Sequence, residues 1–229
     1  MSEEVRKMFS EIAPGYDRTN SVLSFGIHHL WRAKTVRLSQ VKAGDRVLDC
    51  ATGTGDLALA YKKAVGDEGV VYGTDFCAEM LEVAPDKATS RGLDVHWELQ
   101  DAMHLTYDDD SFDVASISFG IRNTDDPVQT LKSMARVVRP GGRVVVLEFG
   151  QPTGIMKPFF SLYSEHILPV IGGMLTGERE AYRYLHETSS AFPCREEFVE
   201  MMDATGVFSS ASYVPCTQGI AYLYIGVVA

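Results

Sequence analysis

Two glycines and an acid stand in this chain where a nucleotide-binding βα unit needs them. Gly53 and Gly55 follow the short apolar run Val47–Leu48 and precede the helix-like run Leu57–Ala60, which gives the order strand, glycine turn, helix. Glycine lets the backbone turn tightly and lie against a ligand, and the helix start offers unpaired N–H groups and a positive dipole. Asp75 follows Gly55 at the spacing of about 20 residues at which an acid accepts hydrogen bonds from a ribose diol.

The charge beside the glycine turn separates two classes of ligand. The carboxylate of Asp49 would repel a pyrophosphate, but it suits the amino group and the sulfonium of S-adenosylmethionine. Asp101 follows the third expected strand, at the edge where open α/β sheets bind ligands. There it is placed to accept from an adenine amino group, while the N–H of Ala102 reaches a ring nitrogen. The alternatives are a tight turn without a ligand, a dinucleotide site of the pattern G-x-G-x-x-G/A, and an N-cap role for Asp101.

Hydrophobic periodicity places the elements that must hold these residues. Strands are expected near 47–48, 69–74, 94–99, 112–117, 143–149, 208–215 and 220–228. Helices are expected near 3–13, 27–38, 77–90, 126–138 and 195–205, with a turn at 139–142. Strands that alternate with helices predict an α/β fold around a mostly parallel sheet. The short link Thr217–Gly219 predicts a late antiparallel hairpin.

Two segments lie outside the regular alternation of a chain whose 229 residues suit a single α/β domain. Residues 1–40 mix aromatic, polar and apolar side chains ahead of the first strand, and we expect an N-terminal helical lid there. Residues 152–193 are too polar to span a membrane and too aromatic for a linker, so we expect a helical insertion over the active site. The alternative for both segments is ordinary packing. For His28, a packing role and a functional role are equally compatible with the sequence.

Composition excludes several partners. Lys and Arg number 21 against 31 Asp and Glu, a formal charge of −10, which argues against nucleic acid because such a partner needs a basic surface. The four cysteines form no C-x-x-C pair, so we expect a reducing, cytoplasmic compartment and no metal site. The charged N-terminus lacks a signal-peptide core, and no window holds the roughly 18 apolar residues of a spanning helix.

Longer motifs along the chain resemble those of one family. In chain order they are Tyr16-Asp17…Asn20…Leu23-Ser24…His28…Trp31, then Ser118–Asn123, Arg136–Gly142 with Leu147–Phe149, Tyr182–Leu185 and Thr217–Ala221. With the glycine turn and the acids they resemble the demethylmenaquinone and polyprenyl-benzoquinol C-methyltransferase family of class I S-adenosylmethionine-dependent methyltransferases. The resemblance covers essentially the whole chain. It departs at Thr19, Arg139 and Gly150, where the family usually has Met, Lys and Ser.

The resemblance implies a Rossmann-like sheet of seven strands, mostly parallel, with helices on both faces and a late antiparallel hairpin. It implies S-adenosylmethionine as the cofactor, with contacts from Asp49, Gly53, Thr54, Gly55, Asp75, Asp101, Ala102 and Ser118. The implied reaction is C-methylation of a polyprenylated quinol ring, namely demethylmenaquinol to menaquinol in menaquinone biosynthesis. The alternatives are 2-methoxy-6-polyprenyl-1,4-benzoquinol in ubiquinone biosynthesis and a small soluble aromatic natural product. More distant rivals are a nucleotide-binding dehydrogenase and a non-catalytic S-adenosylmethionine-binding scaffold.

Four residues are expected to act on the substrate. A quinol hydroxyl, with a pKa near about 10 by analogy with tyrosine, must lose proton character before the ring carbon attacks the methyl group. Arg122 stays protonated, so it would stabilise the developing phenolate, and His166 is a candidate general base. Asn123 and Tyr16 are expected to orient the ring. The apolar tail implies contact with the inner face of a membrane without spanning it, and a homodimer is compatible with the resemblance.

Overall fold

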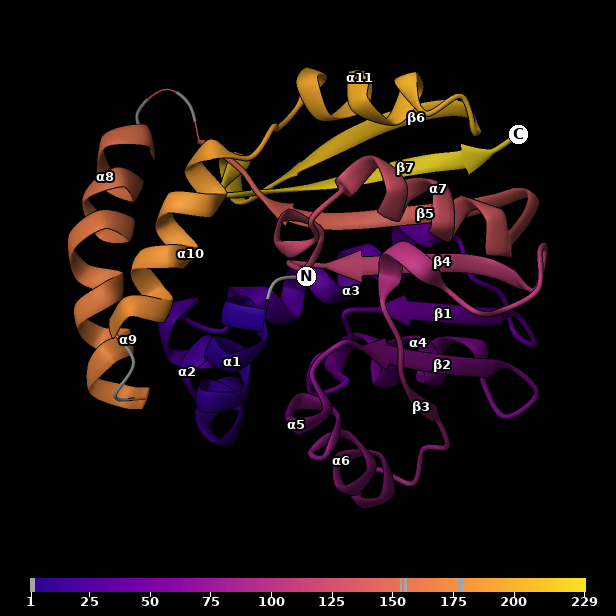
Figure 1. Ribbon diagram of the computed structural model, residues 1–229, viewed down its shortest axis with the longest axis horizontal. Helices are drawn as coiled ribbons and strands as arrows, with labels where there is room; N and C mark the ends of the chain where they lie inside the picture. Colours follow the sequence, from indigo (N-terminus) through magenta and orange to yellow (C-terminus); the bar gives the residue numbers. More distant parts are fainter. Residues whose placement is uncertain (1–2, 153, 155, 177–178) are drawn as a thin grey trace.

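The computed structural model describes residues 3–152, 154, 156–176 and 179–229. Within these residues the strands form one sheet in the order β3-β2-β1-β4-β5-β7-β6. They are β1 (Arg46–Cys50), β2 (Val70–Asp75), β3 (His96–Leu99), β4 (Phe112–Ser118), β5 (Val138–Phe149), β6 (Phe208–Cys216) and β7 (Ala221–Val228). The pairs among β1 to β5 are parallel, and β7 pairs antiparallel with both β5 and β6. The expected mostly parallel sheet with a late hairpin is confirmed (Figure 1).

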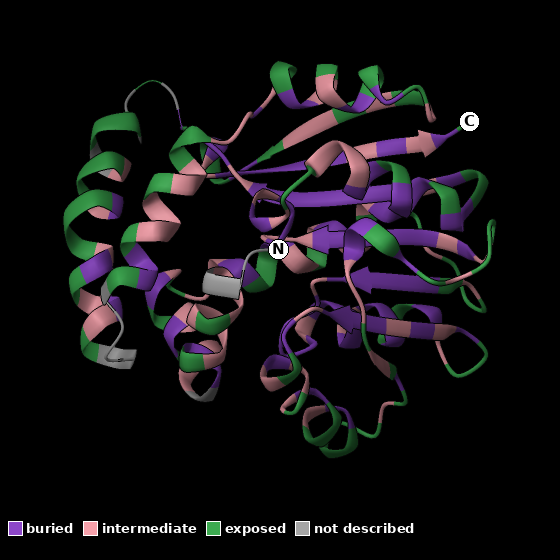
Figure 2. Ribbon diagram, viewed as in Figure 1, coloured by how far each residue is buried: buried purple, intermediate pink, exposed green. Residues whose placement is uncertain are grey.

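Both faces of the sheet are buried, and the alternation of side chains along the central strands explains how. Val47 of β1 and Val145 of β5 point into one apolar cluster, whereas their neighbours Leu48 and Val146 point into another. This follows from the two-residue period of a strand. Strands covered on both faces are apolar throughout, which explains the continuous apolar runs in these parts of the sequence. Figure 2 shows the central strands buried over most of their length.

Helices cover both faces of the sheet. The cluster that contains Val47 also holds residues of α3 (Ile27–Ser39), α4 (Asp56–Val65) and α6 (Ala84–Ser90). The cluster that contains Leu48 holds residues of α7 (Pro127–Val137) and α11 (Glu196–Ala204). Trp31 of α3 is the largest side chain in the first set of contacts, and its Nε1 donates to Thr217 Oγ1 at 2.8 Å. This bond ties the N-terminal part of the chain to the link between β6 and β7.

Two local predictions differ in detail from the structure. The helix expected over 77–90 is two helices, α5 (Ala78–Leu81) and α6, because Pro85 has no N–H for a continuing helix and stands in the first turn of α6. The turn expected at 139–142 lies within β5, since Val138 already pairs with Phe112. The register then shifts before Arg143 pairs with Val114. An irregularity of the β-bulge type therefore accommodates the Pro-Gly-Gly run.

The segments 1–40 and 152–193 contribute helices that pack on one another. The first provides α1 (Glu3–Ile12) and α2 (Tyr16–Leu23), and the second α8 (Met156–Leu162), a π-helical turn (Tyr163–Ile167), α9 (Leu168–Thr176) and α10 (Arg179–Ala191). Ile12, Leu23 and Tyr182 join these helices in a separate apolar cluster. Figure 1 places this layer beside the carboxyl ends of the parallel strands. None of the helices in the described part of the chain is long and apolar enough to cross a membrane.

Candidate active site

A cavity of about 360 Å³ lies between the sheet and the layer formed by these added helices. Its walls include the glycine loop Ala51–Thr54, residues that follow β4, and side chains from α1 to α3 and α8 to α10. Aromatic rings line much of it, among them Phe119, Phe149 and Phe160. A mostly apolar hollow with a few placed polar groups is typical of a site for a small organic ligand.

The two glycines of the loop have different tasks. Both have left-handed backbone angles, with φ of +57° at Gly53 and +83° at Gly55, which a residue with a side chain adopts at a cost. Gly53 lines the cavity. At Gly55 an added Cβ would lie 2.4 Å from Cη2 of Trp97. The missing side chain of Gly55 therefore lets Trp97 pack against the loop, whereas Gly53 presents bare backbone to the cavity.

Asp75 holds the glycine loop from the neighbouring strand. Its Oδ2 accepts from the Gly53 N–H at 2.7 Å, and its Oδ1 accepts from the Cys77 N–H at 2.9 Å. Burial raises the pKa of this carboxyl. Each carboxylate oxygen can accept more than one hydrogen bond, so a ribose diol at the end of β2 would still find acceptors. Asp75 is not among the described residues that line the cavity, and it extends the site along the edge of the sheet.

Asp101 lies at the end of the next strand and has one oxygen engaged. It caps the short 3₁₀ turn Ala102–His104, where its Oδ1 accepts from the Met103 N–H at 3.0 Å. The capping role is thus confirmed, and Oδ2 remains for a ligand. Ala102 is buried next to it. Ser118, the last residue of β4, does line the cavity.

Asp49 lies near the end of β1, beneath the glycine loop. Its side chain is fully buried and accepts hydrogen bonds from Thr52 Oγ1 and Ser116 Oγ, both at 2.6 Å. Burial raises the pKa of Asp49 to about 6. Asp49 is not among the described residues that line the cavity, although its partner Thr52 does line it. The two hydrogen bonds tie the glycine loop to β4, and a contact between Asp49 and the cofactor stays a prediction.

Arg122 lines the cavity with a side chain that is almost completely buried. Its Nη1 donates to Glu148 Oε1 at 2.7 Å and to the carbonyl oxygen of Phe119 at 2.6 Å. The guanidinium also lies 5.4 Å from the centre of the Phe149 ring. Within the described residues, Nε of Arg122 and Oε2 of Glu148 are buried without a hydrogen-bond partner. Burial raises the pKa of Glu148 against the opposing effect of the guanidinium.

Tyr16 and Asn123 are both near Arg122, in different ways. Tyr16 lines the cavity, and burial raises the pKa of its hydroxyl. Asn123 is buried and does not line the cavity; its Oδ1 accepts from the Tyr184 hydroxyl at 3.3 Å. Tyr184 does line the cavity. Asn123 therefore faces a ligand through Tyr184, which the sequence analysis had not singled out.

The cavity is lined by histidines other than His166, the candidate general base. His166, in the π-helical turn, is exposed and is not among the described residues that line the cavity. His28 and His186 line it. Both ring nitrogens of His28 are engaged: Nδ1 lies 2.8 Å from Ser24 Oγ, and Nε2 lies 3.0 Å from Nε2 of His29. Burial, with the charge of Arg32, lowers the pKa of His28 to about 4.

His186 comes from a face of α10 that the sequence does signal. Tyr182, Leu185, His186 and Ser189 all line the cavity and follow the spacing i, i+3, i+4, i+7 of one helix face. This spacing is visible in the sequence as a signal for one face of a helix. Among the described residues, the imidazole of His186 has no hydrogen-bond partner, so it is free to meet a ligand.

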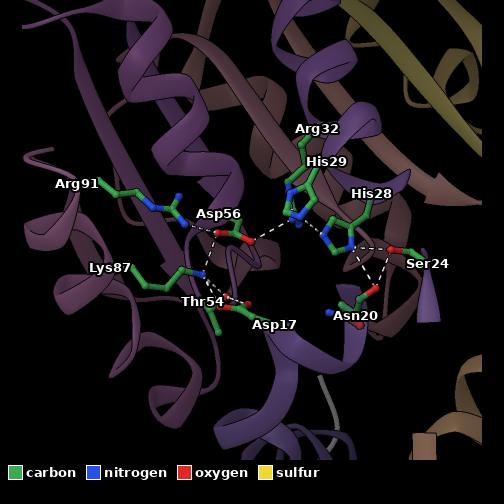
Figure 3. Close-up of polar contacts among 10 residues, drawn as sticks. All are labelled: Asp17, Asn20, Ser24, His28, His29, Arg32, Thr54, Asp56, Lys87 and Arg91. Atoms are coloured by element: carbon green, nitrogen blue, oxygen red, sulfur yellow. Dashed lines mark hydrogen bonds and ion pairs between the residues drawn. The ribbon is translucent and has the colours of Figure 1, made fainter. Parts of the chain in front are cut away.

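A polar network joins the N-terminal helices to the glycine loop (Figure 3). The Thr54 hydroxyl donates to Asp17 Oδ1 at 2.6 Å and accepts from Lys87 Nζ at 3.0 Å. Lys87 also lies 2.6 Å from Asp17 and 2.9 Å from Asp56. Thr54, which was expected to contact a cofactor, is thus on the cavity wall and fixed by α2 and α6.

The donor set of this site fits S-adenosylmethionine. Acids stand at the ends of β2 and β3, bare backbone faces the cavity at Gly53, and the hydroxyl residues Thr54 and Ser118 complete the wall. Carboxylates at such strand ends suit a ribose and an adenine amino group. The sheet order, the glycine loop and this donor set define a class I S-adenosylmethionine-dependent methyltransferase.

Comparison with known proteins defines the family. The model of the ubiE/COQ5 methyltransferase family matches residues 1–228, and the chain belongs to this family. It is 59% identical over 227 residues to "Ubiquinone/menaquinone biosynthesis C-methyltransferase UbiE" of Bdellovibrio bacteriovorus, covering 99% of this chain and 96% of that one. It is 46% identical over 221 residues to "Demethylmenaquinone methyltransferase" of Thermus thermophilus, covering 96% and 99%.

Solved structures support the fold alone. A SAM-dependent methyltransferase of Thermotoga maritima, described as a possible histamine N-methyltransferase, matches with a TM-score of 0.69 and 18% identity over 96% of this chain and 98% of that one. A SAM-dependent methyltransferase of Aquifex aeolicus matches with a TM-score of 0.64 and 18% identity over 86% and 89%. The sheet and its covering helices are therefore those of this large group of enzymes.

Proposed function

We propose that this enzyme transfers a methyl group to a ring carbon of a polyprenylated quinol, and that demethylmenaquinol is its substrate. The observation that carries the proposal is the buried guanidinium of Arg122 in an aromatic cavity beside the glycine loop. The names of its relatives support the substrate class, since one refers to ubiquinone and menaquinone biosynthesis and the other to demethylmenaquinone. The benzoquinol of ubiquinone biosynthesis is the second candidate on the same ground.

The residues of the cavity would make a ring carbon nucleophilic. S-adenosylmethionine supplies an electrophilic methyl group on its sulfonium. Arg122 would stabilise negative charge on the quinol oxygen, because a guanidinium in a site without water acts strongly on a developing charge. Phe119 and Phe149 would hold the ring between the arginine and the glycine loop, which places the reacting atoms and excludes water.

Removal of the quinol proton is assigned to a different histidine from the one first expected. His186 lines the cavity, whereas His166 lies outside it, and a proton acceptor must come within hydrogen-bond reach of its substrate. His28 is a poor acceptor at neutral pH, because its pKa is lowered to about 4. Tyr16 and Tyr184 would orient the ring, and Asn123 would position Tyr184.

The two helical segments, 1–40 and 152–193, would act as a lid through which the prenyl tail leaves the cavity. Phe25 lines the cavity and is nevertheless 80% exposed, so it stands at an opening. Its ring centre lies 6.3 Å from that of Tyr163, and Leu162 next to it is exposed. The outer side of α8 and α9 is largely exposed (Figure 2). We assign this apolar opening to contact with a membrane surface, in the cytoplasm of the cell.

The test of the substrate uses the purified enzyme with labelled S-adenosylmethionine. Reduced demethylmenaquinol, 2-methoxy-6-polyprenyl-1,4-benzoquinol and a tailless naphthoquinol are supplied separately in detergent, and products are identified by mass. Methyl transfer to carbon of demethylmenaquinol with the highest kcat/KM is expected. A preference for the tailless compound would favour a soluble aromatic substrate. Sedimentation of the same preparation tests the homodimer, which we retain as part of this proposal.

A further inference from the structure

The cofactor residues described so far leave one end of S-adenosylmethionine without a partner. They are acids, hydroxyl residues and glycines, whereas the methionine portion of the cofactor ends in a carboxylate. A carboxylate that leaves bulk water needs a cation or several N–H donors. Among the described residues that line the cavity, Arg32 and Arg122 are the permanently charged cations. Among the described cations, Arg122 has the buried Glu148 to itself, whereas Arg32 shares its partner Asp56 with two further cations. Arg32 is therefore the better candidate.

Arg32 stands beside the glycine loop. It projects from α3 toward the first residue of α4, where its Nη2 lies 3.0 Å from Asp56 Oδ2 (Figure 3). Its side chain is only 17% exposed. Arg32 lines the cavity together with Gly53 and Thr54. The guanidinium is therefore held at the point where the glycine loop becomes a helix.

The charges around Arg32 do not balance. Asp56 pairs with Arg32, with Lys87 at 2.9 Å and with Arg91 at 3.5 Å, and Lys87 also pairs with Asp17 at 2.6 Å. Three cations thus face two carboxylates, an excess of one positive charge in a protein whose formal charge is −10. Burial acts to raise the pKa of Asp56, but Arg32 and Lys87 outweigh it and the pKa is lowered. The cluster thus carries one positive charge that neither carboxylate offsets.

The start of α4 adds to the excess of positive charge around Arg32. The helix runs over Asp56–Val65, and Leu57 in its first turn lines the cavity. Unpaired N–H groups and the helix dipole favour an anion at such a place. Arg32 and the helix start therefore converge on the same corner of the cavity.

We propose that Arg32 binds the carboxylate of the methionine portion of S-adenosylmethionine at the start of α4. The inference rests on the cofactor and not on the identity of the quinol. Lys87 and Arg91 do not line the cavity, so they act on the carboxylate only through Asp56 and Asp17. In this arrangement Arg32 also joins α3 to the methyl donor, so binding of the donor draws the N-terminal helices onto the site.

The experiment compares two ligands that differ only in this carboxylate. S-adenosylmethionine and decarboxylated S-adenosylmethionine are titrated by calorimetry, without quinol, into the wild-type protein, Arg32→Gln, Arg32→Lys and Arg91→Gln. Arg91→Gln is the matched control, because it removes a cation of the same cluster that does not face the cavity. The ratio of the two dissociation constants is measured in each preparation, so it does not depend on how much of a variant is folded.

The wild type is expected to bind S-adenosylmethionine about 10- to 100-fold more tightly than the decarboxylated ligand, the size of a charged hydrogen-bonded contact. Arg32→Gln is expected to reduce this ratio to about 1–3, Arg32→Lys to retain part of it, and Arg91→Gln to keep it within about 3-fold of the wild type. Equal weakening of both ligands in Arg32→Gln, or an unchanged ratio, overturns the assignment. Failure of quinol methylation with the ratio intact would overturn the proposed substrate and leave this assignment in place.

Discussion

The guanidinium of Arg122 and the carboxylate of Glu148 form a pair that is almost completely withdrawn from water, with exposed fractions of 4% and 1% and a separation of 2.7 Å. A buried pair contributes little net stability, but removal of one partner leaves an uncompensated charge and is costly. Glu148 comes from β5, and Arg122 from the turn after β4. The rigid central strands therefore hold the cation that we assign to the substrate.

Replacement of Glu148 by Gln is expected to lower both stability and turnover. The free energy of unfolding should fall by about 2–4 kcal/mol, because Arg122 stays charged and buried without its partner. Urea denaturation measures this loss, and a methyl-transfer assay measures kcat. The matched control is Glu187→Gln, which removes an exposed pair with Arg183 at 3.9 Å and should change stability by less than about 0.5 kcal/mol. Equal effects of the two variants would refute the role of the buried pair.

The double variant Arg122→Gln, Glu148→Gln separates charge from folding. Both charges leave together, so the buried site stays neutral and stability should lie within about 1–2 kcal/mol of the wild type. Turnover should still fall by about 100-fold or more, since nothing then stabilises the phenolate. Affinity for S-adenosylmethionine, measured by calorimetry, should change by less than about 3-fold. A double variant with near-normal turnover would show that Arg122 does not act on the substrate.

Local sequence signals predicted the frame of this molecule well. The glycine turn, the apolar strands and the late hairpin depend on short-range chemistry, and the structure has each of them. The differences depend on partners far along the chain. Val138 enters β5 because it pairs with Phe112. Asp49 faces Ser116 of the adjacent strand, and nothing near it in the sequence indicates that.

The site residues also divide into those that local sequence signals indicate and those that depend on partners far along the chain. Gly53 and Thr54 lie in the loop after β1, and Ser118 ends β4. Their place at the carboxyl edge of the sheet, on the cavity wall, was therefore predictable. His166, the candidate general base from the sequence, lies in the π-helical turn Tyr163–Ile167 and is not among the described residues that line the cavity. A π-helical turn alters the face that a helix presents. The contact between Arg32 and Asp56 joins α3, which precedes β1 in the chain, to α4, which follows it. Such a meeting is decided by packing and has no local signal.

The buried Asp49 predicts a pH-dependent cost of folding. Its pKa rises from an ordinary 3.8 to about 6, so the folded protein holds a proton that the unfolded chain releases. The cost is therefore absent below about pH 4, grows between pH 4 and 6, and reaches at most about 3 kcal/mol above pH 6. Asp49→Asn removes it, so the variant should be more stable by about 1–3 kcal/mol at pH 8, with a smaller difference at pH 4.5.

Denaturation of both proteins at the two pH values measures this difference. Thr52 and Ser116 donate to the carboxylate, and an amide can accept from one hydroxyl and donate to the other. A stabilisation that does not depend on pH would refute the titration of Asp49 and point to repacking instead.

Two histidines of the inserted segment should differ in their effect on turnover. His186→Gln is expected to reduce kcat by about 100-fold if this imidazole accepts the quinol proton, with little change in the affinity for S-adenosylmethionine. His166→Gln is the matched control, because His166 is exposed and outside the cavity. Normal turnover in His186→Gln, or a loss in His166→Gln, would reverse the assignment.

The opening at Phe25 should matter only for substrates that carry a tail. Phe25→Ser removes one aromatic side chain that would be buried in the membrane surface. The association of the variant protein with liposomes should therefore weaken by roughly 10-fold in a flotation assay. Leu99→Ser is the matched control, since Leu99 is also exposed but ends β3. Turnover of tailed demethylmenaquinol should fall in the Phe25 variant, while turnover of a tailless quinol stays within about 2-fold. Equal losses on both quinols would place Phe25 in the ring site and remove the argument for a membrane contact.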